Sequence, residues 1–378
     1  MRSRMKKNCM RRAALVLLAM LLFSIPASSQ AWEGEITELP DIGIPFSPQA
    51  EKADLLVISA HPDDELLYFG GTIATYAGEW GMTVQVAYMA HGHGLTRIRE
   101  AMRGLSTCGD TVAPVFLNFR DKYSEDLKTA EKYWGRETTT EAVVELIRRF
   151  RPEVIVTHDL KGEYGHGAHR ITAAAALDAV TLAADPSYAP ESAGRYGTWQ
   201  AKKLYLHLYP ENRITMDWRI PLTAFEGQTA LQIAQEAYEC HESQLEYHHT
   251  VYDSGKYSSI EYGLAFTAVG PDEQGGDFFE NIPPESLTGY IPPSPSPTPD
   301  PIPPPTEAPT PAPTPEPTAE PEEKGAEQDP VPESGGGEKK PERTALIMII
   351  AGVGLAAVLS AALLGSAGRK KKKHARKR

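Results

Sequence analysis

The chain has 378 residues and a formal net charge of −12 at pH 7, and 32 of its residues are proline. An acidic protein surface repels the phosphate backbone, so we expect no nucleic acid partner. Beyond the first ten residues the only cysteines are Cys108 and Cys240. Two cysteines are too few for a disulfide framework, and we expect buried free thiols rather than a disulfide pair.

Residues 1–31 have the pattern of a secretory signal peptide. Six basic residues lie among the first twelve, and residues 13–23 are apolar. The small residues Ser29 and Ala31 then occupy the −3 and −1 positions of a cleavage site before Trp32. An uncleaved anchor is the alternative. Cleavage would leave residues 32–282 as one folded domain, long enough for a large α/β core.

Short apolar runs predict the strands of a buried sheet. They lie at 55–59 (LLVIS), 83–89 (TVQVAYM) and 153–157 (EVIVT), with a weaker fourth at 203–208 (KLYLHL). Apolar residues at helical spacing over 138–150 and an Ala-rich segment at 171–184 predict helices between strands. This alternation predicts an α/β domain with a mostly parallel sheet and helices on both faces.

Polar residues follow two of the predicted strands directly. The segment HPDDE covers residues 61–65 after the first strand, and HDLKGEYGHGAHR covers residues 158–170 after the third. His166 and His169 are spaced i, i+3 where this second loop turns into a helix, so their side chains share one face. Ligands of parallel α/β sheets bind outside the carboxyl ends of the strands. We therefore expect both segments to meet at one edge of the sheet.

The residue types in these segments fit a catalytic metal centre. Zinc in such a centre takes three protein ligands and keeps one position for water, and His61, Asp64 and His169 would supply those ligands. Asp63 would then act as general base toward the water. His166 would stabilise the oxyanion or protonate the leaving amine. Each motif alone is also typical of a helix cap or a surface histidine pair, so the prediction depends on their joint placement.

The motifs AHPDDE (60–65) and GEYGHGAH (162–169) resemble those of the PIG-L/LmbE-like zinc N-deacetylases. The resemblance covers roughly residues 50–250 and implies a Rossmann-like fold and removal of acetate from N-acetylglucosamine-type amides. Carried over position by position, it implies three sets of site residues: the metal ligands His61, Asp64 and His169, the catalytic residues Asp63, His166 and Tyr164, and the substrate-binding residues Arg97, Asp121 and His241.

One position departs from the family pattern. Relatives commonly have HPDH where this chain has His166, Gly167, Ala168 and His169. In the family the missing Asp often hydrogen-bonds the first histidine and raises its basicity, so the acid role of His166 lacks its usual support. Asp159 or Glu163 would have to replace that carboxylate, and the sequence does not choose between them.

The C-terminal part of the chain predicts a membrane anchor. Residues 283–343 alternate Pro with Ser, Thr, Glu and Ala, which favours extended polyproline II structure and predicts a disordered stalk. Residues 344–368 carry no charge and are long enough for one helix across a hydrocarbon core of about 30 Å. The basic tail at 369–378 favours the cytoplasmic side. These features predict a single-pass type I protein of the cell membrane, in contact with lipid through one helix and with its catalytic domain outside.

The leading hypothesis is a metal-dependent hydrolase that removes the N-acetyl group from an N-acetylglucosamine-type amino sugar of the cell envelope or of an extracellular glycan. The expected cofactor is Zn²⁺, with Fe²⁺ as the alternative. The competing hypotheses are a catalytically inactive glycan-binding module on a membrane stalk and a metal amidase that acts on a non-sugar amide. An intact Asp63 beside three metal ligands favours an enzyme, because binding alone needs no base. The sequence leaves the substrate, the native metal and the oligomeric state open.

Overall fold

The computed structural model describes residues 32–92 and 94–289. The predicted signal peptide at 1–31, the transmembrane helix at 344–368 and the basic tail at 369–378 lie outside these residues, as does the proline-rich stalk from residue 290 onward. Among the helices that are described, none combines the length and the apolar character needed to cross a membrane.

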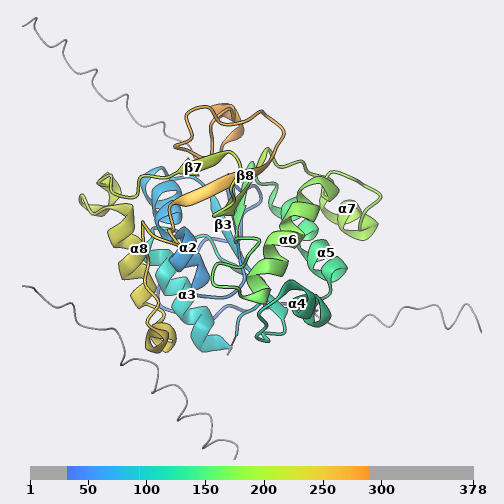
Figure 1. Cartoon of the computed structure of the whole chain (residues 1–378), viewed down its shortest axis with the longest axis horizontal. Coiled ribbons are helices and arrows are strands. Elements are labelled where there is room, and N and C mark those ends of the chain that lie inside the picture. The colour runs from blue at the N-terminus through green and yellow to red at the C-terminus, as the bar shows by residue number, and fades with distance from the viewer. Residues whose placement is uncertain (1–31, 93, 290–378) are drawn as a thin grey trace, which may run out of the picture. The chain divides into compact units, whose positions relative to one another are not determined.

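An eight-stranded sheet forms the centre of the described domain (Figure 1). Its strand order is β1-β4-β3-β2-β5-β6-β8-β7. The strands from β4 to β6 in this order run parallel, and the strands at both edges pair antiparallel. Their bounds are β1 (Trp32–Glu35), β2 (Leu55–Ser59), β3 (Val84–Tyr88), β4 (Val115–Phe119), β5 (Val154–Thr157), β6 (Lys203–His207), β7 (Arg213–Thr215) and β8 (Glu261–Thr267).

The central strands are buried on both faces. In β2, Leu55 and Val57 belong to the apolar core on one face of the sheet, and Leu56 and Ile58 belong to the core on the other. Side chains alternate in direction along a strand, so a strand covered on both faces requires a continuous apolar run. The run LLVIS meets this requirement, which explains why β2 lies between β3 and β5 in the middle of the sheet.

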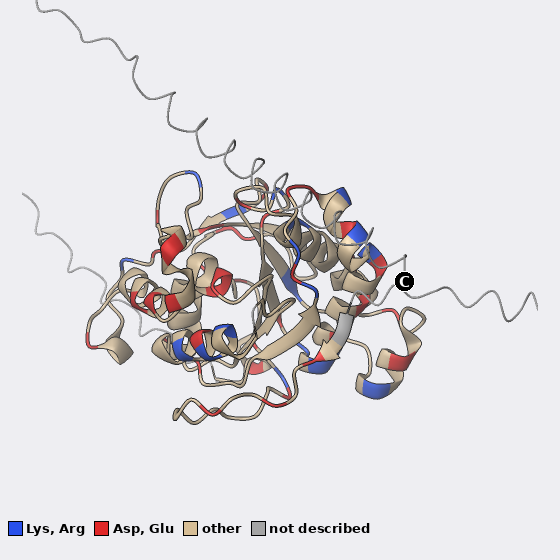
Figure 2. Cartoon of the chain, turned by 90° about the horizontal axis from the view of Figure 1, so that it is seen from below, with Lys and Arg blue, Asp and Glu red and all other residues tan. Residues whose placement is uncertain are grey.

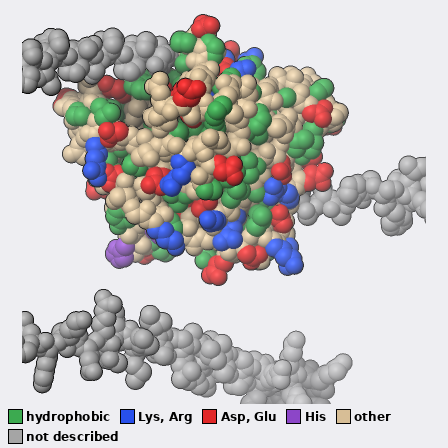
Figure 3. All heavy atoms as spheres, turned by 45° about the horizontal axis from the view of Figure 1, so that its top comes forward, with side chains coloured by type: hydrophobic (Ala, Val, Ile, Leu, Met, Phe, Trp, Pro, Cys, Tyr) green, Lys and Arg blue, Asp and Glu red, His purple; other side chains and the backbone are tan. Residues whose placement is uncertain are grey.

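Helices cover both faces of the sheet (Figure 1). Helices α2, α3 and α8 pack together over one face, whereas α4, α5 and α6 pack over the other, with α7 against α5. The bounds are α2 (Asp64–Ile73), α3 (Leu95–Thr107), α4 (Leu127–Trp134), α5 (Arg136–Phe150), α6 (Gly167–Leu182), α7 (Pro190–Tyr196) and α8 (Ala230–Glu239). Figure 2 shows most charged residues on helices and loops rather than on the central strands, and Figure 3 shows both signs of charge mixed with apolar side chains on one face.

The predicted α/β fold with a mostly parallel sheet is confirmed, and four predicted strands match β2, β3, β5 and β6 to within one residue at each end. The helix predicted at 138–150 begins two residues earlier, at Arg136. The helix predicted at 171–184 begins at Gly167 and ends at Leu182, so that His169 lies in its first turn. The sequence analysis did not predict β4 or the three antiparallel strands.

The order of the strands creates a crevice at the carboxyl ends of the central strands β2 and β5. From β2 the chain continues to β3 and β4 on one side, whereas from β5 it continues to β6 on the other. The connections that follow the neighbouring strands β2 and β5 therefore run to opposite sides of the sheet. A doubly wound sheet binds its ligands outside the carboxyl ends of such a pair of strands. Both polar segments of the sequence, 61–65 and 158–170, begin at this point.

Candidate active site

The loop after β2 holds an acidic residue in a strained backbone conformation. Asp63, directly before α2, has a φ of 119° and a ψ of −36°. This region favours glycine and costs other residues about 1–3 kcal/mol. The amide of Asp63 donates to Oε2 of Glu65 at 2.6 Å, and Arg97 pairs with Oδ1 of Asp63 at 3.0 Å. These neighbours hold Asp63 where the backbone alone does not favour it.

Asp64, the first residue of α2, lies between two imidazoles. Its Oδ2 atom is 3.0 Å from Nδ1 of His61 and 3.1 Å from Nε2 of His169. The same oxygen accepts the backbone amide of His61 at 3.0 Å. Asp64 is 3% exposed and His169 is fully buried. One carboxylate therefore connects the residues that follow β2 with those that follow β5.

The loop after β5 turns tightly before α6. Gly162 has a φ of 71°, and a Cβ atom at this position would lie 2.3 Å from the carbonyl oxygen of His166. The amides of Gly165 and His166 both donate to the carbonyl oxygen of Gly162, at 2.8 and 3.0 Å. This turn, which requires glycine at residue 162, brings His166 to the position directly before α6.

Three histidine rings converge where the two loops meet. The ring centroid of His166 lies 4.9 Å from that of His61 and 4.8 Å from that of His169. One possible ligand atom of each of these residues lies within 4.8 Å of the other two. Asp64, His158 and His169 form a second group of this kind among the described residues.

Hydrogen bonding decides which of these atoms are free to bind a metal. Nε2 of His158 accepts the amide of Ala60 at 2.8 Å and its Nδ1 lies 3.2 Å from Glu163, so both of its nitrogens are engaged. The Nε2 atoms of His61 and His169 are buried and form no hydrogen bond. Buried nitrogens of this kind beside a carboxylate fit a divalent metal. The predicted set of His61, Asp64 and His169 is neither of the two groups, but Asp64 contacts both imidazoles, so this ligand set stays a prediction.

The carboxylates make this part of the site attractive to positive charge. Burial alone would lower the pKa of His169, but the larger combined effect of Asp64 and Glu163 raises it to about 10. Burial likewise lowers the pKa of His61, whereas Asp121 and Asp64 raise it to about 9. The same field that favours protons on these imidazoles favours a metal cation in their place.

The pKa shifts of the two predicted proton-transfer residues differ in direction. Burial and the charge of Asp64 raise the pKa of Asp63 to about 7, against the lowering effect of Arg97. Burial and the two neighbouring histidines lower the pKa of His166 to about 3. At neutral pH Asp63 is therefore able to exchange a proton, and His166 is a neutral imidazole.

A cavity of about 360 Å³ opens at these residues, within the size range of small-molecule sites. Seven of the nine predicted site residues line it: His61, Asp63, Asp64, Arg97, Asp121, Tyr164 and His166. His169 lies deeper and reaches the others through Asp64. The remaining lining residues, to which the sequence analysis assigned no role, are Tyr123, Gln244, Tyr247 and His249.

Arg97 lies at the cavity but is engaged with the chain itself. Its guanidinium donates to the carbonyl oxygen of Pro62 and pairs with Asp63. The side chain is 9% exposed. The structure thus gives Arg97, which the sequence analysis assigned to substrate binding, a clear contact with the predicted base.

The structure does not bring His241 into the cavity. Its side chain is fully buried, and its Nε2 lies 2.8 Å from Oε1 of Glu65. The predicted substrate contact of His241 stays a prediction, and the neighbour that the structure gives this side chain is Glu65. Ser243 binds Glu100 of α3, and Gln244 is the residue of this segment that lines the cavity.

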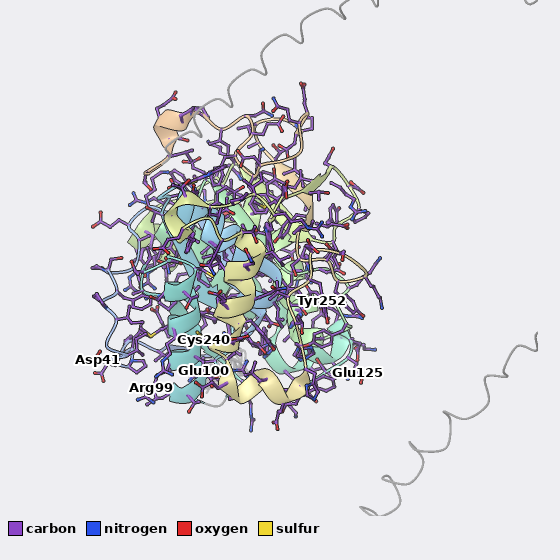
Figure 4. All side chains as sticks on the ribbon, turned by 90° about the vertical axis from the view of Figure 1, so that its left-hand side faces the viewer. Asp41, Arg99, Glu100, Glu125, Cys240 and Tyr252 are labelled. Carbon is purple, nitrogen blue, oxygen red and sulfur yellow. The ribbon has the colours of Figure 1, made fainter. Side chains whose placement is uncertain are left out.

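Both cysteines of the described domain are free thiols, as expected. Cys108 is buried, whereas Cys240 is half-buried. Figure 4 shows Cys240 at the end of α8, near Glu100 on the neighbouring helix α3.

The structure shows which group contacts His166 in place of the Asp that relatives commonly have in the second motif. The sequence offered Asp159 or Glu163 as partner of His166, but no described carboxylate is hydrogen-bonded to it. Glu163 instead lies 2.6 Å from Nδ1 of His169. The partner of Nδ1 of His166 is the hydroxyl of Tyr164, at 3.4 Å.

We expect the purified protein to bind about one divalent metal ion per chain, and we expect His169→Ala to lose it, because this change removes one of three ligands. The metal content after dialysis, measured by plasma mass spectrometry, checks this. The control His249→Ala removes an imidazole from the rim of the cavity and should leave the metal content unchanged. A folded His169→Ala protein with a full equivalent of metal would contradict the assignment.

Part of the chain matches a known protein family. The profile of the family described as PIG-L, GlcNAc-PI de-N-acetylase, matches residues 56–180. This range contains all of β2 but its first residue, all of β5, most of α6 and both polar segments. Eight of the nine predicted site residues fall within it, and His241 lies beyond it.

Three relatives carry closely similar names. A 1D-myo-inositol 2-acetamido-2-deoxy-alpha-D-glucopyranoside deacetylase 1 of Frankia casuarinae is 33% identical over 46% of this chain and 67% of the relative. A deacetylase of the same name, without the number, from Rhodococcus erythropolis is 32% identical over 44% of this chain and 68% of the relative. A deacetylase 1 of Catenulispora acidiphila is 30% identical over 44% of this chain, but the match spans only 59% of that relative.

Proposed function

The chain belongs to the PIG-L family of de-N-acetylases, and on this premise we propose that it removes the N-acetyl group from an N-acetylglucosamine-type amino sugar of the cell envelope or of an extracellular glycan. The observation that carries the proposal is a cavity lined by Asp63, His61 and His166, in which Nε2 of His61 is buried and forms no hydrogen bond. The reaction consumes water, breaks the amide C–N bond, and yields acetate and a free amine. Zn²⁺ is the proposed metal, with Fe²⁺ as the alternative.

Asp63 is the residue that moves the first proton. Zinc held by His61, Asp64 and His169 would polarise the amide carbonyl and lower the pKa of water. Arg97 fixes one carboxylate oxygen of Asp63, and the side chain of Glu65 fixes its amide. Asp63 faces the cavity in this fixed position and accepts the proton of the attacking water.

His166 and Tyr164 supply hydrogen-bond donors at the cavity. His166 is neutral at neutral pH, and its Nδ1 lies 3.4 Å from the hydroxyl of Tyr164. A hydroxyl that donates to Nδ1 leaves the single ring proton on Nε2. From Nε2 the N–H donates a hydrogen bond to the developing oxyanion, and the leaving amine takes the proton that Asp63 accepted from water. Tyr164 thereby takes over the orienting role that relatives give to a carboxylate.

An inactive glycan-binding module is the second candidate, because no described carboxylate is hydrogen-bonded to His166. The position of Asp63 favours the enzyme, since a strained and ion-paired carboxylate contributes nothing that binding alone requires. A metal amidase that acts on a non-sugar amide would use the same residues. Product analysis with both substrate classes separates this third possibility from the first.

We expect Asp63→Asn to retain metal and to lower kcat by about 10²- to 10⁴-fold, the usual contribution of a general base. Asparagine also tolerates a positive φ, so the loop should keep its conformation. Acetate release from N-acetylglucosamine and its oligomers measures the rate, and the metal content of the same samples serves as control. Unchanged turnover would remove Asp63 from the mechanism.

We expect Arg97→Gln to move the acidic limb of the pH–rate profile to higher pH. Arg97 lowers the pKa of Asp63, so its loss raises that pKa and keeps the base protonated up to a higher pH. The pH dependence of kcat/KM for acetate release measures the shift. Arg103→Gln removes an equal charge from an exposed position on α3 and should leave the limb in place. A limb unmoved in both variants would argue against Asp63 as the titrating base.

We further propose that the protein resides in the cell membrane as a single-pass type I protein with the catalytic domain outside. The support is the signal-like pattern of residues 1–31 and the uncharged segment 344–368 before a basic tail. Protease added to intact cells should remove the domain without lysis. A domain that is digested only after lysis would place it on the inner side.

A further inference from the structure

The carboxylate of Glu163, which does not line the cavity, contacts three imidazoles. The side chain of Glu163 is fully buried. Its Oε2 lies 2.6 Å from Nδ1 of His169, and its Oε1 lies 3.2 Å and 3.0 Å from the Nδ1 atoms of His158 and His207. The amide of Asp159 also donates to Oε1, at 2.9 Å. The proposed reaction assigns no step to His158, His207 or Glu163.

The partners of these atoms show which of them carry protons. Nε2 of His158 accepts the amide of Ala60, so the ring proton of a neutral His158 lies on Nδ1 and points at Glu163. Together with the amide of Asp159, this gives Oε1 two donors whose direction is fixed. An oxygen that accepts two such hydrogen bonds carries no proton of its own, so Oε1 acts as an acceptor.

His207 completes the group. Its Nδ1 faces Oε1 of Glu163 at 3.0 Å, and its Nε2 faces the carbonyl oxygen of Ser258 at 2.9 Å. Both ring nitrogens of His207 are therefore held, one by Glu163 and one by the backbone. The ring of Tyr68, at a centroid distance of 5.0 Å, and full burial shield the contact between His207 and Glu163 from water.

The contact between Glu163 and His169 determines which nitrogen of His169 reaches a metal. A neutral imidazole has one proton and one lone pair, and a carboxylate at Nδ1 selects the form with the lone pair on Nε2. Nε2 of His169 is the atom that faces Asp64 and forms no hydrogen bond. The carboxylate therefore prepares His169 as a ligand through the ring atom on the far side.

We propose that Glu163 and His207 are positioning residues of the metal site: Glu163 holds His169 with Nε2 toward the metal, and His207 holds Glu163. The proposal rests on the metal-dependent function proposed above. His169 lies in α6, whereas His207 ends β6 and Glu163 lies in the loop after β5. These contacts thus tie a ligand on a helix to β6 and to the loop after β5, so that the rigid sheet fixes its orientation.

The test measures zinc affinity rather than turnover. Purified full-length protein, freed of metal, is titrated with zinc in competition with a chromogenic chelator. We expect Glu163→Gln and His207→Leu to bind zinc about 10- to 100-fold more weakly than the wild type. His207→Gln should fall between wild type and His207→Leu, because its amide still donates one hydrogen bond to Glu163. His249→Ala, at the exposed rim, should bind as the wild type does.

Two further measurements separate positioning from a general loss of structure. Thermal unfolding of the metal-free variants shows whether they fold, and the visible spectrum of bound Co²⁺ reports the geometry of the ligands. A changed Co²⁺ spectrum and weaker zinc binding in a folded His207→Gln or His207→Leu support the proposal. Wild-type zinc affinity in either folded variant would overturn it. A wild type that binds zinc but releases no acetate from any amino sugar would overturn the proposed function alone.

Discussion

Polar groups buried at the end of a sheet must satisfy one another, and this requirement governs the arrangement of the whole site. The carboxylates of Asp64, Glu65 and Glu163 each accept a hydrogen bond from one backbone amide and contact at least one histidine nitrogen. These pairings consume most of the hydrogen-bonding capacity of the buried histidines. The Nε2 atoms of His61, at the cavity, and of His169, deeper, remain without hydrogen bonds.

The sequence predicted the elements whose pattern comes from burial on both faces, and missed those whose pattern comes from tertiary contacts. Residues 55–59 form an unbroken apolar run because β2 is covered by helices on both sides. The edge strands β1 and β7 have four and three residues, too few for an alternation to be recognised. The start of α6 at Gly167 was missed because glycine disfavours helix. It is required there, since a Cβ atom would meet Oγ of Ser124 at 1.9 Å.

The candidate site shows the same division. His61, Asp63 and Asp64 follow β2 directly, and His169 lies in the first turn of the helix after β5, so the strand predictions were sufficient to place them at one end of the sheet. The burial of His241 depends on its contact with Glu65, which is 176 positions away in the sequence. The contact between Glu163 and His207 joins residues that are 44 positions apart. Spacing along the chain does not reveal either contact. His207 was concealed for a further reason, because it ends an apolar strand and resembles a residue of the core.

The backbone at Asp63 implies that folding and chemistry make opposing demands on one position. A φ of 119° is one that glycine adopts at little cost and that every side chain makes unfavourable. A glycine at this position would relax the loop and stabilise the fold, yet it would have no group to accept a proton. The carboxylate is thus retained against the conformational preference of the chain, which is the signature of a trade-off between stability and activity. Variants selected only for heat resistance would be expected to lose this residue early.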